Sequence, residues 1–147
     1  MFKKVKIFPF LLSLVVISLF ACEKKDGYAE PPIFDKSKFA FDADAKDTVL
    51  ITKNNVHWWF SDISINKKVV LITELKYASK NVPAGADNDW ADIYKFENDW
   101  FIIEKLDNRK IKVSLKANPD LAAREMSFGA TVGNAGAGIT ILQAGKK

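Results

Sequence analysis

Cys22 and His57 are the only residues of their types in a chain of 147 residues, and both types are common in nucleophilic and metal chemistry. A single histidine cannot build a histidine-based metal cage, and it supplies at most one imidazole base. No serine stands in a nucleophile elbow. His57 precedes Trp58 and Trp59 at the start of an expected strand, where a half-buried or edge histidine is the ordinary structural role. We therefore predict no catalytic residue, no metal site and no cofactor.

The acidic stretch DNDWAD, Asp87 to Asp92, contains side chains that could bind calcium or the hydroxyls of a sugar. It lacks the glycine and the final glutamate that a calcium-binding loop of the EF-hand type places at fixed positions. Carboxylates are abundant enough for a glycosidase pair, but they lie in loops that specify no groove. The alternative to a site is a solvated acidic loop in which Asp89 caps a short helix.

Aromatic residues are numerous, with four Trp, three Tyr and eleven Phe. Sugar rings stack on flat aromatic faces, while amides and carboxylates bind their hydroxyls. Neighbours in a strand face opposite sides, so either Trp58 or Trp59 points outward, whereas Trp100 opens a core-like strand and is expected to be buried. The predicted ligand-binding residues are Trp90, Tyr94, Tyr77, Trp59, Asp87, Asn88 and Asp89. The alternative is that Trp90 and Tyr94 only pin the segment around them to the domain.

Residues 1–21 have the parts of a secretory signal: Lys3, Lys4 and Lys6, an apolar run, and a small residue at the end. The apolar run is shorter than the roughly 20 residues of a membrane-spanning helix. Leu19-Phe20-Ala21-Cys22 resembles the bacterial lipobox. The resemblance implies thioether lipidation of Cys22, cleavage before it and acylation of the new N-terminus with fatty acids such as palmitate. The alternative is a structural or free thiol.

The segment from residue 22 to 38 begins with Glu23-Lys24-Lys25-Asp26 and contains Pro31-Pro32, which indicates a lipidated tether. The charged residues resemble the export tags of outer-membrane lipoproteins on the cell surface, and a plain solvated charge run is the alternative. Three of the 22 basic residues lie before Cys22 and none of the 18 acidic ones does. The rest of the chain is therefore nearly neutral, which argues against nucleic acid as a partner.

From Phe39 onward the chain alternates polar and apolar residues between turn sequences, which predicts an all-β domain over residues 39–147. About eight strands with short connections favour a two-sheet antiparallel, immunoglobulin-like sandwich. The expected strands are Ser37–Phe41, Thr48–Thr52, Val56–Ile65, Lys68–Tyr77, Trp100–Leu106, Arg109–Ala117, Arg124–Val132 and Gly138–Ala144. The glycine-rich stretch from 133 to 138 is expected to be a hairpin. Ala78 to Asp99 is expected to be an irregular insertion, in which Trp90, Ile93 and Tyr94 have the spacing of a single helical turn.

The C-terminal half of this pattern resembles the BACON domain, an immunoglobulin-like β-sandwich of bacterial surface and secreted proteins. The residues that carry the resemblance are Trp100, Ala117-Asn118, Arg124 and Gln143-Ala144-Gly145, preceded by the stretch TVLITKNNVHWWFS. The segment from Lys68 to Asp99 departs from the family pattern. The resemblance implies a module that binds carbohydrate or glycoprotein, or that acts as a spacer, and it transfers no binding residues to this chain.

These observations together predict a non-catalytic lipoprotein of the outer membrane, anchored through Cys22 and exposed at the cell surface. Its expected partners are the membrane, a glycan or glycoprotein, and neighbouring membrane proteins. A structural or protein-interaction subunit without glycan binding is the alternative, which an exposed edge strand or apolar patch would favour.

Overall fold

The computed structural model describes residues 29–80 and 92–147. Their alternating sequences form ten strands and one short 3₁₀ helix, η1. The elements are β1 (Lys38–Phe41), β2 (Lys46–Ile51), β3 (Trp59–Ile65), β4 (Lys68–Val69), η1 (Ile72–Glu74), β5 (Lys76–Ser79), β6 (Ile93–Glu97), β7 (Phe101–Lys105), β8 (Lys110–Leu115), β9 (Arg124–Thr131) and β10 (Gly136–Gln143).

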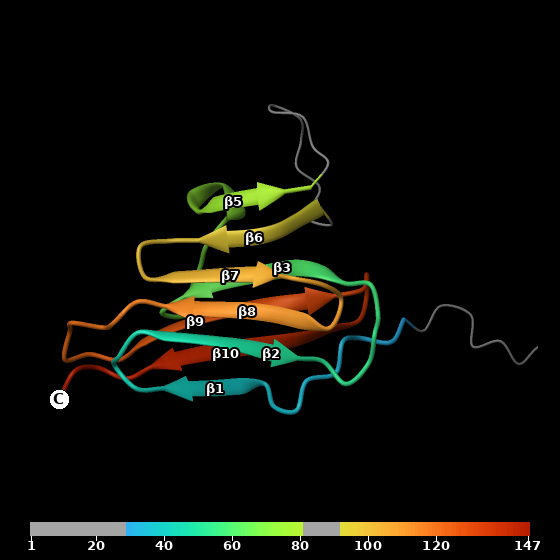
Figure 1. Cartoon of the computed structure of the whole chain (residues 1–147). Coiled ribbons are helices and arrows are strands. Elements are labelled where there is room, and N and C mark those ends of the chain that lie inside the picture. Colours follow the sequence, from blue (N-terminus) through green and yellow to red (C-terminus); the bar gives the residue numbers. More distant parts are fainter. Residues whose placement is uncertain (1–28, 81–91) are drawn as a thin grey trace, which may run out of the picture.

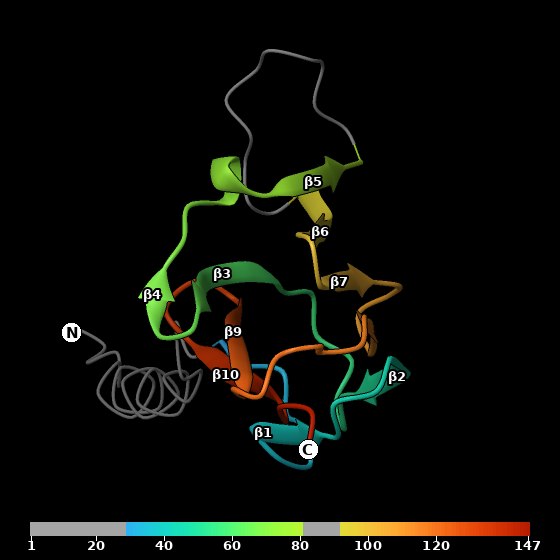
Figure 2. The same cartoon turned by 90° about the vertical axis from the view of Figure 1, so that its left-hand side faces the viewer.

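The strands form two five-stranded sheets packed face to face, which confirms the predicted immunoglobulin-like sandwich (Figure 1). The strand order is β1-β10-β9-β3-β4 in one sheet, called here the first sheet, and β2-β8-β7-β6-β5 in the second sheet. All pairings within the sheets are antiparallel except that of β1 with β10, which is parallel. Figure 2 shows the two layers edge-on, with β5 and β6 at one end of the second sheet.

Aromatic side chains fill the core between the sheets. Phe60 on β3 makes edge-to-face contacts with Trp58, Phe96 and Phe128, with ring centroids 5.2, 4.9 and 5.5 Å apart. All four side chains are fully buried. Phe96 comes from β6 of the second sheet, so Phe60 joins the two layers. Edge-to-face packing of this kind stabilises a core beyond the burial of apolar area.

The single strand predicted over Lys68–Tyr77 is wrong, because this segment carries the chain from one sheet to the other. Strand β4 pairs with β3 through only two residues, and η1 follows. The Glu74 side chain accepts a hydrogen bond from the Leu71 N–H at 3.3 Å, and Ile72 is buried. The alternating hydrophobicity of this segment is typical of a strand. A crossing between the two sheets requires a bend, and the local hydrogen bond at η1 pairs a backbone N–H that the bend removes from a sheet.

Ile93 and Tyr94 lie in strand β6 and not in the predicted helical turn. A bulge opposite Ala78 and Ser79 shifts the pairing of β5 with β6, so that Ile93 and Phe96 both face the core. A bulge adds one residue to one strand and thereby changes the period of the inward positions. The helical turn was expected from the spacing of Trp90, Ile93 and Tyr94, but Ile93 and Tyr94 are adjacent residues of a strand and Trp90 lies outside the described residues.

Part of the predicted tether is attached to the sandwich. Phe34 pairs with Thr52 in an isolated antiparallel bridge, and Phe34 packs against the core. Asn54 accepts a hydrogen bond from the Ile33 N–H at 2.8 Å and donates one to the Pro31 carbonyl at 2.9 Å. The chain is thus held to the domain from about Pro31 onward, several residues before the predicted boundary at Phe39.

Asn66 and Lys67 form a tight hairpin between β3 and β4, and the hairpin predicted at the glycine-rich stretch is confirmed. Asn66 and Lys67 have φ values of 49° and 67°, the left-handed conformation that a tight two-residue hairpin requires. Gly133 has a φ of 87°, which glycine adopts without the steric cost of a side chain. In the same loop the Val132 N–H donates to the Ala135 carbonyl at 2.8 Å. This second hairpin joins β9 to β10.

Candidate functional site

Several residues singled out in the sequence lie outside the described residues. They are the signal segment 1–21, Cys22, Asp87, Asn88, Asp89 and Trp90. Among residues 29–80 and 92–147, no cluster of three or more histidine, cysteine, aspartate or glutamate side chains could hold a metal ion. No helix in the same residues is long and apolar enough to cross a membrane.

Tyr77 packs into the sandwich. It is paired directly with Phe96 on the neighbouring strand, and residues in such a pair lie on the same face of a sheet. Phe96 is fully buried, and Tyr77 is half-buried against the core. The position of Tyr77 therefore matches the packing role rather than a ligand platform.

Tyr94 is half-buried at the start of β6, where the Lys80 ammonium lies 5.7 Å from the centroid of its ring. Tyr94 lines a small cavity at the end of the sandwich together with Lys80 and Lys105. The cavity lies on different elements from Trp59, so the described aromatic candidates do not form one platform.

The tryptophan pair divides as predicted between the core and the outer face. Trp58 is fully buried, and its Nε1 donates a hydrogen bond to the Asn108 carbonyl at 2.8 Å. Trp59 is half-exposed and pairs directly with Thr131 on β9. Thr131 lies between the core-facing positions of β9, so the register places Trp59 on the outer face of the first sheet.

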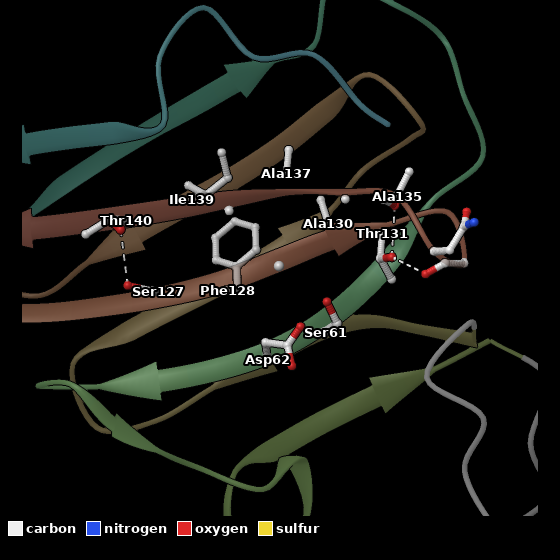
Figure 3. A pocket seen from close by; sticks show the side chains of 15 residues that line it. Ser61, Asp62, Ser127, Phe128, Ala130, Thr131, Ala135, Ala137, Ile139 and Thr140 are labelled. Atoms are coloured by element: carbon white, nitrogen blue, oxygen red, sulfur yellow. Dashed lines mark hydrogen bonds between the residues drawn. The ribbon is translucent and has the colours of Figure 1, made fainter. Parts of the chain in front are cut away.

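A shallow groove crosses this outer face over strands β3, β9 and β10 (Figure 3). Its middle row consists of Ser61, Gly129 and Gly138, which are paired across the three strands. The groove encloses about 350 Å³. Phe128 and Ile139 turn their side chains into the core, so the floor between them is main chain. It is open at Gly138, whereas the Ser61 hydroxyl occupies the space where a side chain at Gly129 would stand. Glycine in a strand is typical of places where a ligand approaches the backbone closely.

Polar side chains flank the glycine floor. On one side Ser127 and Thr140 share a hydrogen bond of 3.2 Å. On the other side the Thr131 hydroxyl lies 3.0 Å from the carbonyls of Gly133 and Ala135, within the hairpin. Trp59 belongs to the same outer row as Thr131 and Gly136 by register. The described lining holds no lysine or arginine, so its chemistry is that of hydroxyls, one carboxylate and the amide of Asn134.

Asp62 supplies that carboxylate. It has a φ of 48° and lies in the interval between Ser61 and Ser64 where the pairing of β3 with β9 shifts. A positive φ on a residue other than glycine is strained and tends to occur at functional sites. Bulges re-aim side chains, and here the Asp62 Oδ2 would lie 3.4 Å from a Cβ added at Gly129. The bulge thus brings a carboxylate to the edge of the glycine floor.

Sequence reasoning did not find this groove. The signal was present, because Gly129 and Gly138 occupy outward positions of two predicted alternating strands, where a solvated strand ordinarily carries a side chain. The pairing of the two glycines depends on the register of β9 with β10, which the strand pattern alone does not fix.

The residues that carry the family resemblance build a structural network instead of a binding site. The Arg124 Nε donates to the Gln143 Oε1 at 2.9 Å, and the Arg124 guanidinium lies 4.5 Å from the centroid of the Trp100 ring. Asn118 donates to the carbonyls of Ala122 and Ala144, both at 2.9 Å. Trp100 is half-buried under this arginine, not fully buried as predicted. These contacts close one end of the sandwich.

No protein-family model and no curated protein matches the chain. Among solved structures, the NMR structure of a protein from Bacteroides thetaiotaomicron matches with a TM-score of 0.61 at 20% identity, over 84% of this chain and 95% of that one. A Bacteroides ovatus GH5 xyloglucanase, solved with a XXXG heptasaccharide, matches with a TM-score of 0.39 at 13% identity, over 76% of this chain and 18% of the enzyme. An endo-fucoidan hydrolase of glycoside hydrolase family 107 matches with a TM-score of 0.38 at 12% identity, over 78% of this chain and 13% of the enzyme. The first similarity shows the fold alone, and the two enzyme matches are too weak to add to it.

Proposed function

We propose that this chain is a membrane-anchored, non-catalytic surface lipoprotein whose sandwich binds a neutral glycan, or the glycan of a glycoprotein, in the groove across β3, β9 and β10. The observation that carries the proposal is the paired glycine floor between rows of hydroxyl-bearing side chains. A sugar ring offers hydroxyls around an apolar ring face, so it suits a site with hydroxyl partners and room for close approach. Trp59 on the adjoining outer row offers an aromatic face for stacking.

The groove's chemistry argues for binding without catalysis. Asp62 is the one carboxylate among the described residues of the lining, whereas glycoside hydrolysis ordinarily uses two carboxylates on opposite sides of the scissile bond. The absence of a cation from the described lining also argues against a phosphate-bearing ligand, since phosphate recognition relies on lysine and arginine.

Gly138→Ile is the sharpest test of the groove. A Cβ at Gly138 meets nothing within 4 Å, so a side chain can start there without overlap, and isoleucine favours the strand conformation. The side chain would stand on the floor of the groove and exclude a ligand. We expect glycans that an array identifies for the wild-type protein to lose about tenfold or more in affinity, measured by calorimetry, with a thermal midpoint no lower than that of the wild type.

Ser114→Ile is the matched control, because it places the same side chain on the outer face of the second sheet. It should bind like the wild type, and Trp59→Ala should weaken binding without abolishing the fold. If the wild type binds no neutral glycan, or if Gly138→Ile binds as tightly as the wild type, the groove is not a glycan site.

The proposed attachment to the membrane depends on Cys22. We expect Cys22→Ser to move the protein from the membrane fraction to the soluble fraction, because the thioether and its acyl chains would be missing. Mass spectrometry of the intact protein would check the modification directly. Glu23→Gln is the control, since it should keep the lipid, and protease treatment of whole cells would report whether its surface exposure changes. An unchanged membrane fraction for Cys22→Ser contradicts the proposal.

A second candidate function, docking to a neighbouring membrane protein, is favoured by the edge strand β2. Its outward residues Val49 and Ile51 are 44% and 54% exposed. An edge strand with an apolar row can accept a strand from another chain. The occupant would be a partner's extended strand, and the double variant Val49→Lys, Ile51→Lys should abolish co-purification while leaving glycan binding intact.

A further inference from the structure

A small polar cavity lies at the end of the sandwich, beside the turn between β7 and β8. It encloses about 210 Å³. Its lining includes the side chains of His57, Lys80, Asp92, Tyr94, Lys105 and Asp107. Pockets for drug-sized ligands enclose roughly 300–1,000 Å³, so this one suits a single charged group or a small ring. It shares no residue with the groove, and its role is independent of the proposed glycan binding.

Lys105 is held in the wall of this cavity. Its ammonium lies 4.4 Å from the centroid of the Trp58 ring and donates a hydrogen bond to the Trp58 carbonyl. Trp58 is itself fully buried and anchored to the Asn108 carbonyl. A lysine ammonium has three N–H donors, so Lys105 keeps donors for a further acceptor while its position stays fixed.

Two lysines and two aspartates line this cavity, but no ion pair joins them directly among the described residues. In the described part of the chain, neither Lys80 nor Lys105 has a carboxylate within ion-pair distance. Asp107 is engaged elsewhere: it accepts the Arg109 N–H at 2.7 Å and lies 3.8 Å from the Lys110 ammonium. Asp92 is the other carboxylate of the lining, and His57 is exposed at its margin.

The protonation of Lys105 reflects this arrangement. Desolvation by burial and then the positive charge of Lys80 lower its pKa to about 8, while Asp107 acts in the opposite direction. At neutral pH Lys105 is therefore mostly protonated, although its burial and the positive charge of Lys80 both disfavour the charged form. An anion between the two lysines would stabilise the charged form of Lys105, because a nearby opposite charge favours that form.

We infer that this cavity binds an oxyanion, a carboxylate or a sulfate group, between the ammonium groups of Lys105 and Lys80. Tyr94 supplies a hydroxyl and a ring face beside them, so the anion can be free or carried on an acidic sugar. Asp92 sets an upper limit on the affinity, because its carboxylate repels the ligand.

The direct test follows the Lys105 side chain by NMR in protein with labelled lysine. Sodium acetate, sodium sulfate and sodium glucuronate are titrated against sodium chloride at equal ionic strength. We expect a saturable rise in the pKa of Lys105 from about 8 with the oxyanions and not with chloride. Tighter binding of glucuronate than acetate identifies a sugar acid as the ligand, whereas equal binding identifies the free anion.

Two substitutions with opposite expected effects on the affinity for the oxyanion distinguish a binding role of the cavity from a structural one. Lys80→Met should lower the affinity for the oxyanion, and Asp92→Asn should raise it. Lys112→Met, on the outer face of β8, should leave the affinity unchanged. Above pH 8 the wild-type affinity should fall by up to about tenfold per pH unit as Lys105 loses its proton. Lys105→Arg should keep its affinity in that range, because arginine stays charged.

The inference is overturned if chloride shifts the Lys105 pKa as much as the oxyanions do, since that result means screening of Lys80 alone. It is also overturned if Lys80→Met and Asp92→Asn leave the affinities unchanged. Loss of glycan binding in Gly138→Ile has no bearing on these outcomes, because the groove and this cavity share no lining residue.

Discussion

Phe60→Ala is expected to lower the free energy of unfolding by about 3–5 kcal/mol, the range for large aromatic deletions in a core. Phe60 is fully buried and contacts rings from both sheets, so alanine would leave a cavity between the layers. The surrounding rings are held by their own strands and cannot close the space fully. Urea unfolding followed by tryptophan fluorescence would measure the loss, because the neighbouring Trp58 reports on the same region.

Two substitutions calibrate this measurement. Phe60→Leu keeps most of the volume and should cost less than alanine. Val69→Ala removes apolar atoms from a side chain that is 74% exposed, and it should stay within about 0.5 kcal/mol of the wild type. Equal losses for Phe60→Ala and Phe60→Leu would show that edge-to-face contacts, and not the cavity, dominate at this position.

Gln143→Leu is expected to cost about 1–3 kcal/mol, because leucine has a similar size but removes the hydrogen bonds of a fully buried amide, including the one from the Arg124 Nε. The Gln143 Nε2 lies 3.2, 3.0 and 3.0 Å from the carbonyls of Ala43, Asp44 and Lys116. Its Oε1 accepts the Arg124 Nε. The side chain is fully buried, so water cannot replace these bonds without opening that end of the sandwich.

A double-mutant cycle with Arg124→Met would separate the bond between the two side chains from the bonds to the carbonyls. Thr140→Val on the outward face of the same strand is the control, and it should cost less than about 1 kcal/mol, because it removes one partly buried bond. A loss for Gln143→Leu no larger than that of Thr140→Val would mean that the network is dispensable for stability.

The strand pattern alone determined most of the fold. Period-two alternation in Lys110–Leu115 and Arg124–Thr131 put Ile111, Val113, Met126 and Phe128 inward, and all four are buried. It also showed that one of two adjacent tryptophans must face out. These predictions succeeded because alternation is a local property of a strand and needs no knowledge of its neighbours.

The tertiary structure alone decided where chemistry can occur. The groove depends on Gly129 lying opposite Gly138 and beside Ser61, which is a matter of register between three strands. The end cavity depends on Lys80 and Lys105, which reach it from β5 and β7 of the second sheet with β6 between them. Ile93 and Tyr94, expected in a helical turn, lie in a strand because β6 pairs with both of these strands. Pairings between distant segments are set by packing and turn geometry summed over the whole chain, so a local pattern cannot specify them. The proposed lipid anchor at Cys22 is the reverse case, because a targeting signal is read as a linear sequence and is complete before the chain folds.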